Sequence, residues 1–557
     1  MKFQGIYRAF MVPVHHTGMR SPFLRRSSAG SPFRVSLLTG LLIATGTPAF
    51  APAQVNAPER TPSPLFSKAL PDLGDETDLS IAAERRLGDS IVRSLYRDPD
   101  YLDDPILTDY VQSIWQPLLR SARARGDLRP DMDEVFAWEI LISKERDVNA
   151  FALPGGYFGL YLGLVGMVNT RDELASVLGH EISHVTQRHI ARRMSKESAQ
   201  TPWVIGGMIL GLLAASKSNN YNAANATIMG SQAIAIQNSL NYSRDMEREA
   251  DRTGFGLTTE AGFEAQGFVA MFEKLQQAGR NNDSGGFPYL RSHPLTTERI
   301  ADMQGRIGMQ AAAPLPAYAD WQALLMAARA RVLSNSGVDA LRLWQADVQP
   351  KALASKTPAQ QAAALYGAAL AAIRMRALEP AKALVERLAA VAGAPPLVER
   401  IARLLRADIA LATEDLAGAA NAMAAQVRPA LPNEVVLDRA ELLLRAQLQT
   451  DSGQAEQAAR DLYRWVLAHP RDFNAWRSLG RAYEVQGRSI AAIRALAQAD
   501  GLQHDWSAAL ARLRAAQDLV RKGQWGSQGP DYIEATIVDT RAREIVQMMR
   551  EQAAQQR

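Results

Sequence analysis

The sequence predicts an α+β fold that is predominantly helical, with a mixed domain followed by a helical array. Most strand-forming runs lie in a short window between residues 135 and 160. Amphipathic helical patterns fill most of the remaining chain, and a 34-residue period appears after residue 440. At 557 residues, of which 47% are hydrophobic and 22% charged, the chain can form two or three globular domains.

Residues 1–53 are typical of a secretory signal peptide. They contain six basic residues and no acidic ones, and the basic residues precede an apolar run at 35–44. Small residues follow, and we expect cleavage after Ala53. An uncleaved anchor is the alternative, and Met11 and Met19 are alternative starts of translation.

The leader accounts for the positive charge of the chain. The formal net charge is +4 and becomes about −2 once the leader is removed, so the charge does not favour a nucleic-acid partner. Because the chain has no cysteine, it has neither disulfides nor a cysteine for lipid attachment. The apolar run 203–215 is too short for a membrane span and is predicted to be a buried or interfacial helix, or a flap.

Residues 54–82 are rich in proline and polar side chains, which predicts an extended N-terminal arm. Three runs rich in β-branched and aromatic residues are then expected to be strands: 135–143, 148–153 and 157–160. Pro154-Gly155-Gly156 predicts a tight turn between the last two strands. A helix should begin near Thr170, because Thr170 and Glu173 have the spacing of a capping box ahead of an apolar stripe.

This predicted helix carries the motif His180-Glu181-Ile182-Ser183-His184, an H-E-x-x-H pattern. Two histidines four residues apart lie about 40° apart around a helix axis, so both imidazoles can reach one ion. Glu181 points in a neighbouring direction, where a carboxylate can accept a proton from a zinc-activated water. The motif therefore predicts one Zn²⁺ per chain.

The third zinc ligand lies outside this window. Metzincins require a further histidine six residues after the second motif histidine, and that position here is Ile190. His189 is one residue too early and about 140° around the helix from His184. Packing or a hydrogen bond is therefore its expected role.

A second, acidic helix offers carboxylates instead. Glu247 and Asp251 are four residues apart and share a helix face, so one can bind the metal while the other accepts a histidine N–H. Spacing alone does not decide between this arrangement and a charged surface helix. Glu249 points elsewhere and is expected to be exposed to solvent.

The H-E-x-x-H motif, followed about sixty residues later by S-R-x-x-E-x-x-A-D, resembles the gluzincin peptidases that include the CAAX prenyl protease and the heat-shock protease HtpX. The resemblance covers about 83–309 and implies a zincin-type metallopeptidase domain with a small edge-strand sheet. The zinc ligands that it implies are His180, His184 and Glu247. Glu181 would be the general base, and Asp251 would orient a ligand histidine. Those relatives cross the membrane several times, whereas no membrane span is predicted in this chain after its leader.

The leader and the repeats narrow the resemblance to the periplasmic β-barrel assembly-enhancing proteases of Gram-negative bacteria. In that family a histidine before proline, here His293, is similar to a switch that can take the water's position on zinc. The family also has an edge strand before the catalytic helix, and its counterparts here are Asn149, Ala150, Phe151 and Ala152. The resemblance implies that this strand binds extended substrate chains by β-augmentation.

The region after the peptidase-like domain is predicted to be helical. Small residues and prolines at 310–322 indicate a linker, and the 34-residue period lies within 323–525. The clearest unit resembles the tetratricopeptide (TPR) pattern and predicts a C-terminal TPR α-solenoid, with a generic Ala-rich bundle as the alternative. Its signature residues are Trp476, Leu479, Gly480, Tyr483, Ala492 and Ala499. The tail, 526–557, is predicted to be a short strand and then a helix.

Together these features predict a periplasmic zinc endopeptidase that degrades misfolded or stalled outer-membrane proteins. The repeats would dock onto the β-barrel assembly machinery, with a chaperone role beside proteolysis, and contact with the membrane would be peripheral at most. The alternative is a non-proteolytic chaperone or assembly adaptor with a silenced zinc site. The presence of Glu181 favours the enzyme.

Overall fold

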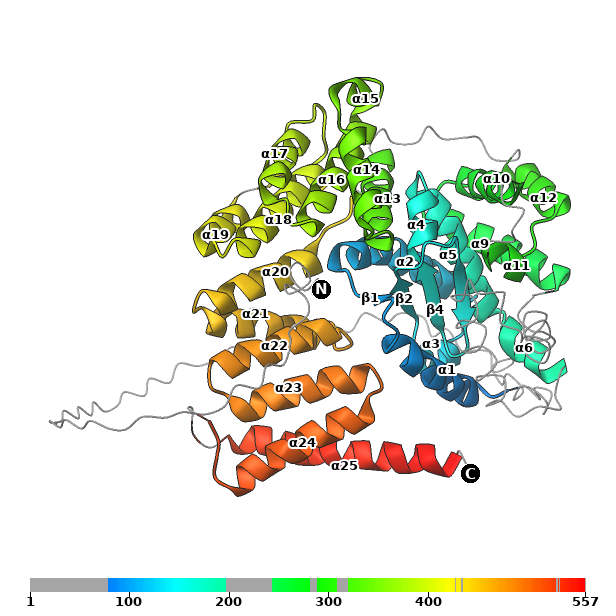
Figure 1. Ribbon diagram of the computed structural model, residues 1–557. Helices are drawn as coiled ribbons and strands as arrows, with labels where there is room; N and C mark the ends of the chain where they lie inside the picture. The colour runs from blue at the N-terminus through cyan, green and yellow to red at the C-terminus, as the bar shows by residue number, and fades with distance from the viewer. Residues whose placement is uncertain are drawn as a thin grey trace, which may run out of the picture. The chain divides into compact units, whose positions relative to one another are not determined.

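The computed structural model describes most of the chain after the predicted leader (Figure 1). The described residues are 79–196, 243–280, 288–307, 319–425, 427–431, 434–526, 529 and 531–555. The predicted signal peptide, nearly all of the arm and the apolar run 203–215 lie outside them. Among the described residues, none of the helices combines the length and the apolar character needed to cross a membrane.

A four-stranded sheet forms the centre of the first domain, with the strand order β1-β2-β4-β3. The strands are β1 (Tyr101–Leu102), β2 (Glu139–Ser143), β3 (Ala150–Leu153) and β4 (Tyr157–Tyr161). β2 runs parallel to β4, and β3 pairs antiparallel with β4 at the edge of the sheet. The predicted turn joins β3 to β4, and Gly155 and Gly156 adopt φ values of 75° and 76°, which glycine allows without a Cβ penalty.

The strand predicted over 135–143 is shorter in the structure. Pro130 begins a short helix, α3 (Pro130–Val135), and β2 starts only at Glu139. Pro130 favours the first turn of a helix because its φ is already helical and it lacks the N–H that would go unused there. Trp138, with φ 49°, then separates the helix from the strand.

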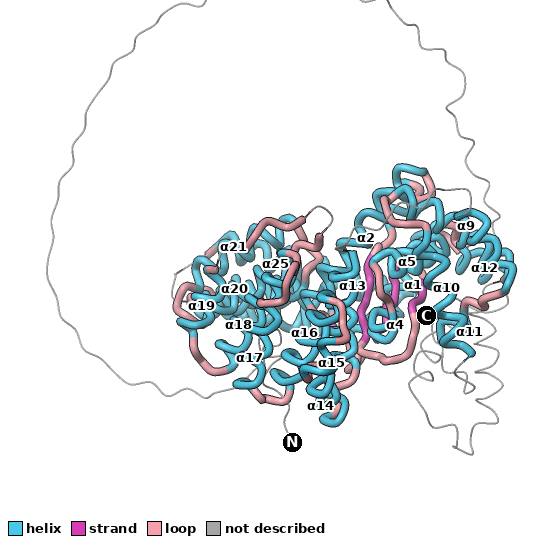
Figure 2. The backbone as a smooth tube through the Cα atoms, turned by 90° about the horizontal axis from the view of Figure 1, so that it is seen from above, coloured by secondary structure: helices cyan, strands magenta, loops and turns pink. Residues whose placement is uncertain are grey.

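Helices cover both faces of the sheet (Figure 2). On one face, α1 (Ile81–Tyr96) packs Leu87 and Ile91 against Leu141 and Tyr157. The other face belongs to a larger core that includes residues of α2 (Pro105–Arg125) and α5 (Arg171–Thr186). Thr170 caps α5 as predicted, because its hydroxyl accepts a hydrogen bond of 3.2 Å from the Glu173 N–H.

Two glycines allow α5 to approach α9 (Arg244–Glu260) closely. A Cβ on Gly254 would lie 3.1 Å from the carbonyl of Gly179, and one on Gly179 would lie 2.8 Å from the Thr258 hydroxyl. Any larger residue at either position would push the helices apart. This contact therefore determines how near the acidic face of α9 comes to the histidines of α5.

Short helices complete the domain around α5 and α9. They are α4 (Leu162–Met167), α6 (His189–Lys196), α10 (Gln266–Arg280), α11 (Pro288–Ser292) and α12 (Thr297–Ile307). α10 packs on α5, and α12 packs on α9 and α10. The loop between α11 and α12, which contains His293, is thereby held next to α9.

The C-terminal region is entirely helical within its described residues, and sequence neighbours pack side by side (Figure 1). The helices are α13 (Ala319–Ser334), α14 (Val338–Asp347), α15 (Pro350–Ala354), α16 (Pro358–Arg374), α17 (Leu378–Ala389), α18 (Pro396–Ala412), α19 (Leu416–Ala424), α20 (Asp438–Asp451), α21 (Ala455–Ala468), α22 (Phe473–Val485), α23 (Ser489–Leu502), α24 (Trp506–Arg521) and α25 (Tyr532–Gln555). α13 begins inside the predicted linker 310–322 and packs on α4 as well as on α16.

The predicted strand at the start of the tail 526–557 is wrong, because α25 begins at Tyr532. The β-branched residues there suggested a strand, but the buried residues Val538, Ala542 and Ile545 recur at helical spacing. Asp531 accepts a hydrogen bond of 3.0 Å from the Glu534 N–H and thereby caps the helix.

Candidate metal centre

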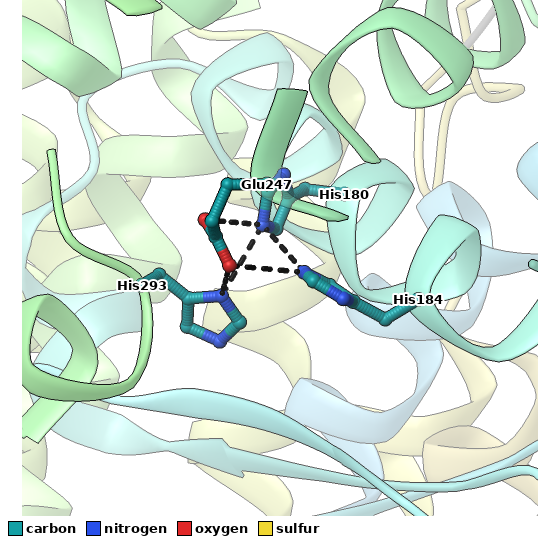
Figure 3. Close-up of side chains that lie close together, drawn as sticks. All are labelled: His180, His184, Glu247 and His293. Atoms are coloured by element: carbon teal, nitrogen blue, oxygen red, sulfur yellow. Dashed lines mark hydrogen bonds and ion pairs between the residues drawn. The ribbon is translucent and has the colours of Figure 1, made fainter. Parts of the chain in front are cut away.

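α5 carries the H-E-x-x-H residues in the buried interior of the first domain. His180, Glu181 and His184 are almost inaccessible to solvent. The Nε2 atoms of His180 and His184 lie 2.9 Å apart, so both rings point to one location, as the four-residue spacing predicted (Figure 3). Both histidines are held by a helix that is itself buried on all sides.

Two further side chains reach the same location from other elements. Glu247, in the first turn of α9, places one carboxylate oxygen 3.5 Å from His180 Nε2 and the other 3.5 Å from His184 Nε2. His293, directly after α11, has its Nδ1 atom 3.0 Å from Glu247 and 3.3 Å from His180 Nε2 (Figure 3). One donor atom from each of these four residues lies within 4.8 Å of the other three.

The donor types and their separations fit a zinc ion. Three imidazole nitrogens and a carboxylate oxygen are ligands that zinc prefers. Tetrahedral zinc with bonds of about 2.0–2.1 Å separates its donor atoms by about 3.3 Å, and the donor separations given above range from 2.9 to 3.5 Å. These four residues can therefore hold one zinc ion without a large rearrangement.

The charge of the site also favours a cation. Burial lowers the pKa of His180, but hydrogen bonds and charge from Asp251 and Glu247 outweigh burial and raise that pKa to about 10. Burial likewise opposes ionisation of Glu247, but the neighbouring His293 and His180 hold its pKa well below the ordinary value. Burial lowers the pKa of His184 well below its ordinary value. The carboxylates that favour a proton on His180 would equally favour a divalent metal ion in its place.

A layer of polar contacts orients the ligand residues from behind. Asp251 lies one turn after Glu247, and its Oδ1 atom is 3.0 Å from His180 Nδ1. Arg299, on α12, is 2.7 Å from Glu247 Oε2 and donates hydrogen bonds of 2.6 and 2.8 Å to Asp251. Local sequence does not indicate this role for Arg299, because one arginine in a charged helix carries no local signal.

The third histidine of the motif window lies outside the four-residue cluster. His189 Nδ1 is 2.9 Å from His184 Nδ1, and His189 Nε2 is 3.1 Å from Glu249 Oε2. The expectation that Glu249 is simply exposed to solvent is wrong, since its side chain is 33% exposed and contacts both His189 and Arg192. Packing of α6 on α5 turns His189 towards His184, which helical spacing alone did not predict.

Glu181 faces the cluster from the side of the sheet. Its Oε1 atom lies 3.4 Å from His293 Nε2. Burial raises the pKa of Glu181, although charge from His293 and His180 and the nearby N–H of Ala152 oppose the shift. The carboxylate is thus next to both the cluster and the edge strand.

The edge strand β3 (Ala150–Leu153) overlaps the predicted segment Asn149 to Ala152. The Tyr161 N–H donates to the Asn149 carbonyl at 3.0 Å, so alternation directs the backbone of Phe151 towards β4 and that of Ala150 and Ala152 away from it. Among the described residues, β3 has a strand partner on one side only. Its other side faces the region of Glu181.

Known proteins resemble this chain over the same region and beyond it. The model of peptidase family M48 matches residues 105–307. A putative β-barrel assembly-enhancing protease of Vibrio cholerae is 31% identical over 462 residues, which make up 82% of this chain and 89% of the relative. The β-barrel assembly-enhancing protease of Escherichia coli is 29% identical over 466 residues, 83% of this chain and 90% of the relative. The mitochondrial metalloendopeptidase OMA1 of Arabidopsis thaliana is 30% identical over 197 residues, 35% of this chain and 36% of the relative.

Proposed function

This chain belongs to the β-barrel assembly-enhancing proteases of peptidase family M48 and is a zinc metalloendopeptidase, and from that premise we propose that it degrades misassembled outer-membrane proteins in the periplasm. The buried cluster of His180, His184, Glu247 and His293 is the observation that carries the proposal. The signal-like leader supports export. The names of the relatives supply the context of β-barrel assembly.

In this proposal His180, His184 and Glu247 hold the zinc ion, and Glu181 is the general base. Zinc at this position supplies Lewis-acid polarisation of the scissile carbonyl and lowers the pKa of a bound water. Glu181 accepts the proton of the attacking water and passes it to the nitrogen of the leaving amine. Burial supports this role, because it raises the pKa of Glu181 and makes the protonated carboxyl easier to form. Asp251 and Arg299 hold the ligands in place.

His293 has the geometry of a switch. A catalytic zinc site has three protein ligands and an open position, whereas four protein ligands close the site. His293 places Nδ1 among the other three donors and would occupy that open position. We infer that the enzyme is inactive while His293 remains there and becomes active when the loop after α11 moves away.

The edge strand supports a preference for unfolded chains. An extended segment that pairs with Ala150 and Ala152 would lie alongside Glu181. Backbone pairing recognises extension rather than side-chain sequence, which suits misfolded or stalled substrates.

The C-terminal helices support a docking role as a TPR solenoid. The signature residues Trp476, Leu479, Gly480 and Tyr483 are buried in α22. A Cβ on Gly480 would lie 2.9 Å from Leu496, so this position requires a small residue where α23 packs. The β-barrel assembly machinery is the partner that the relatives' names suggest for this array.

A non-proteolytic chaperone or assembly adaptor is the second candidate. The position of His293 favours it, because a site closed by a fourth protein ligand has no room for the attacking water. The two functions make opposite predictions for the His293→Ala variant. Proteolysis should rise in that variant if His293 is a switch, and should stay absent if the site is structural.

The test compares casein digestion and zinc content in the wild type, Glu181→Gln and His293→Ala. Glu181→Gln should keep its zinc. The combined variant, Glu181→Gln with His293→Ala, should cleave casein at least about 100-fold more slowly than His293→Ala alone. Glu134→Gln, an exposed glutamate on α3, is the matched control and should change neither. Undiminished cleavage in the combined variant would exclude Glu181 as the base, and no cleavage in any variant would favour the adaptor.

A further inference from the structure

The third histidine of the motif window, His189, contacts the ligand residue His184 by a route that a continuous helix does not provide. Residues five apart on a helix lie about 140° apart around its axis, so His184 and His189 would not meet. Here α5 ends at Thr186, and Arg188 adopts a left-handed φ of 52° before α6 begins at His189. This break brings the two rings to a centroid separation of 4.9 Å. A left-handed backbone is unfavourable for a non-glycine residue, so the surrounding contacts must stabilise it.

The contact between these rings indicates one arrangement of their protons when His184 binds a metal. Metal binding uses the lone pair of His184 Nε2, the atom that lies in the cluster, so the proton of the neutral ring is on Nδ1. That proton is donated to His189 Nδ1, 2.9 Å away, which must therefore accept. The proton of His189 is then on Nε2 and is donated to Glu249 Oε2, 3.1 Å away.

The two ligand histidines are thus supported in different ways. His180 has a carboxylate, Asp251, directly behind its Nδ1 atom. Behind the Nδ1 atom of His184, the imidazole of His189 lies between His184 and the carboxylate of Glu249. His189 is fully buried, whereas Glu249 is partly exposed and also contacts Arg192 at 3.1 Å.

We propose that His189 and Glu249 are positioning residues for the zinc site, forming a hydrogen-bonded relay that orients the ring of His184 and holds its proton on Nδ1. The proposal rests on the zinc-binding role proposed above for His184. Outer partners of ligand histidines contribute about 10- to 100-fold to metal affinity or activity. The relay would therefore contribute through His184 without touching the metal or the substrate.

The principal test is the zinc affinity of the purified full chain, measured by competition with a chromophoric chelator. His189→Phe keeps a ring of similar size and removes both hydrogen bonds, and it should weaken zinc binding about 10- to 100-fold. His189→Gln keeps an acceptor for the His184 proton and should recover part of that loss. Glu249→Leu should weaken zinc binding less, and Glu260→Gln, an exposed change on the same helix, should have no effect.

A second readout separates orientation from simple folding. Cobalt substituted for zinc should show a changed visible absorption spectrum in His189→Phe and Glu249→Leu, because the spectrum reports ligand geometry. With a peptide substrate, kcat should fall while KM stays the same, since the proposed relay acts through the ligand His184 and not through backbone pairing at the edge strand. If His189→Phe does not fold, Glu249→Leu still tests the relay through its partly exposed position.

The outcomes distinguish the relay from the underlying zinc site. Unchanged affinity and an unchanged cobalt spectrum in folded His189→Phe or in Glu249→Leu would overturn the relay, provided that His184→Ala loses zinc. If His184→Ala binds zinc as tightly as the wild type, the assignment of the zinc ligands fails, and the relay fails with it. Weaker binding in both relay variants with partial rescue by His189→Gln supports the proposal.

Discussion

At the scale of single residues, the metal centre depends on charges that compensate each other out of contact with water. Glu247, Asp251 and Arg299 are all at most 5% exposed, and the arginine contacts both carboxylates. A buried carboxylate without a partner is costly, because its lost hydration is not replaced. Arg299 therefore stabilises these carboxylates in the zinc-free protein, and a bound zinc ion would stabilise them as well.

Replacing Arg299 by Leu should destabilise the zinc-free protein strongly. Removing one partner from a buried charge network costs about 3–5 kcal/mol, and here two carboxylates lose their cation. The free energy of unfolding, measured by urea denaturation with and without zinc, should show the larger loss without zinc. Arg306→Leu, further along the same helix and more exposed, is the control. Equal effects of the two substitutions would contradict this role of Arg299.

Zinc affinity should rise with pH between about 7 and 9. In the metal-free protein, the pKa of His180 is about 10, so this ring carries a proton that zinc must displace. The pKa values of His184 and Glu247 are well below their ordinary values, so these two groups have already lost their protons in this range. With one proton released per zinc ion, affinity should increase about tenfold per pH unit. Chelator competition at several pH values checks the slope, and a flat profile would exclude a protonated His180.

At the scale of elements, the edge strand and the catalytic helix form one functional unit. β3 lies against α5, and its outward-facing backbone groups at Ala150 and Ala152 are next to Glu181. A strand-like substrate would meet the general base without any specific side-chain pocket. This arrangement predicts recognition with a period of two residues along the substrate.

N-methylation of a peptide substrate tests that period. An N-methyl group at a residue that bonds to β3 removes one hydrogen bond worth about 1 kcal/mol, or about fivefold in kcat/KM. N-methylation at the intervening residues should have little effect, because their N–H groups point away from β3. Cleavage rates for a series methylated at one position each provide their own internal controls. A uniform decrease along the series would argue against pairing at this edge.

At the scale of the whole described chain, the helical region and the peptidase-like domain share a core. α13 has buried apolar residues on nearly every side, among them Trp321, Leu325, Met326 and Leu333. A helix that is apolar all round must be covered on all sides. α4 covers one side of α13 and α16 another. Further along, Arg439 of α20 pairs with Asp103 at 2.6 Å, next to α2.

A fragment of residues 79–318, which ends before α13, should not fold stably. Each large apolar side chain of α13 contributes about 1.5–3 kcal/mol by burial, so losing several of them removes much of a typical stability of about 5–15 kcal/mol. A longer fragment, 79–451, keeps the shared core through α20 and should unfold cooperatively. Thermal unfolding followed by circular dichroism compares the two fragments. A cooperative transition in the shorter fragment would show that the peptidase-like domain folds without α13.

Local sequence patterns were sufficient to predict a structural feature wherever a single helix or turn determines it. Thr170 caps α5 as its spacing with Glu173 indicated, and the four-residue spacing of His180 and His184 directs both rings to one location. Pro154-Gly155-Gly156 turns the chain between two strands, and the first of them lies at the edge of the sheet. These features follow from helical and strand periodicity, which neighbouring residues encode by themselves.

Only the tertiary structure decided how residues from different elements meet. Arg299, His293 and the pair of His189 and Glu249 reach the metal centre from loops and helices whose packing no local spacing describes. The boundary at α13 and the helical start of α25 were likewise decided by burial. By itself, the sequence determined the zinc-binding motif and the family of the enzyme, because these depend on short spacings. The assembled charges and the relay depend on close approach across the core, which packing alone establishes.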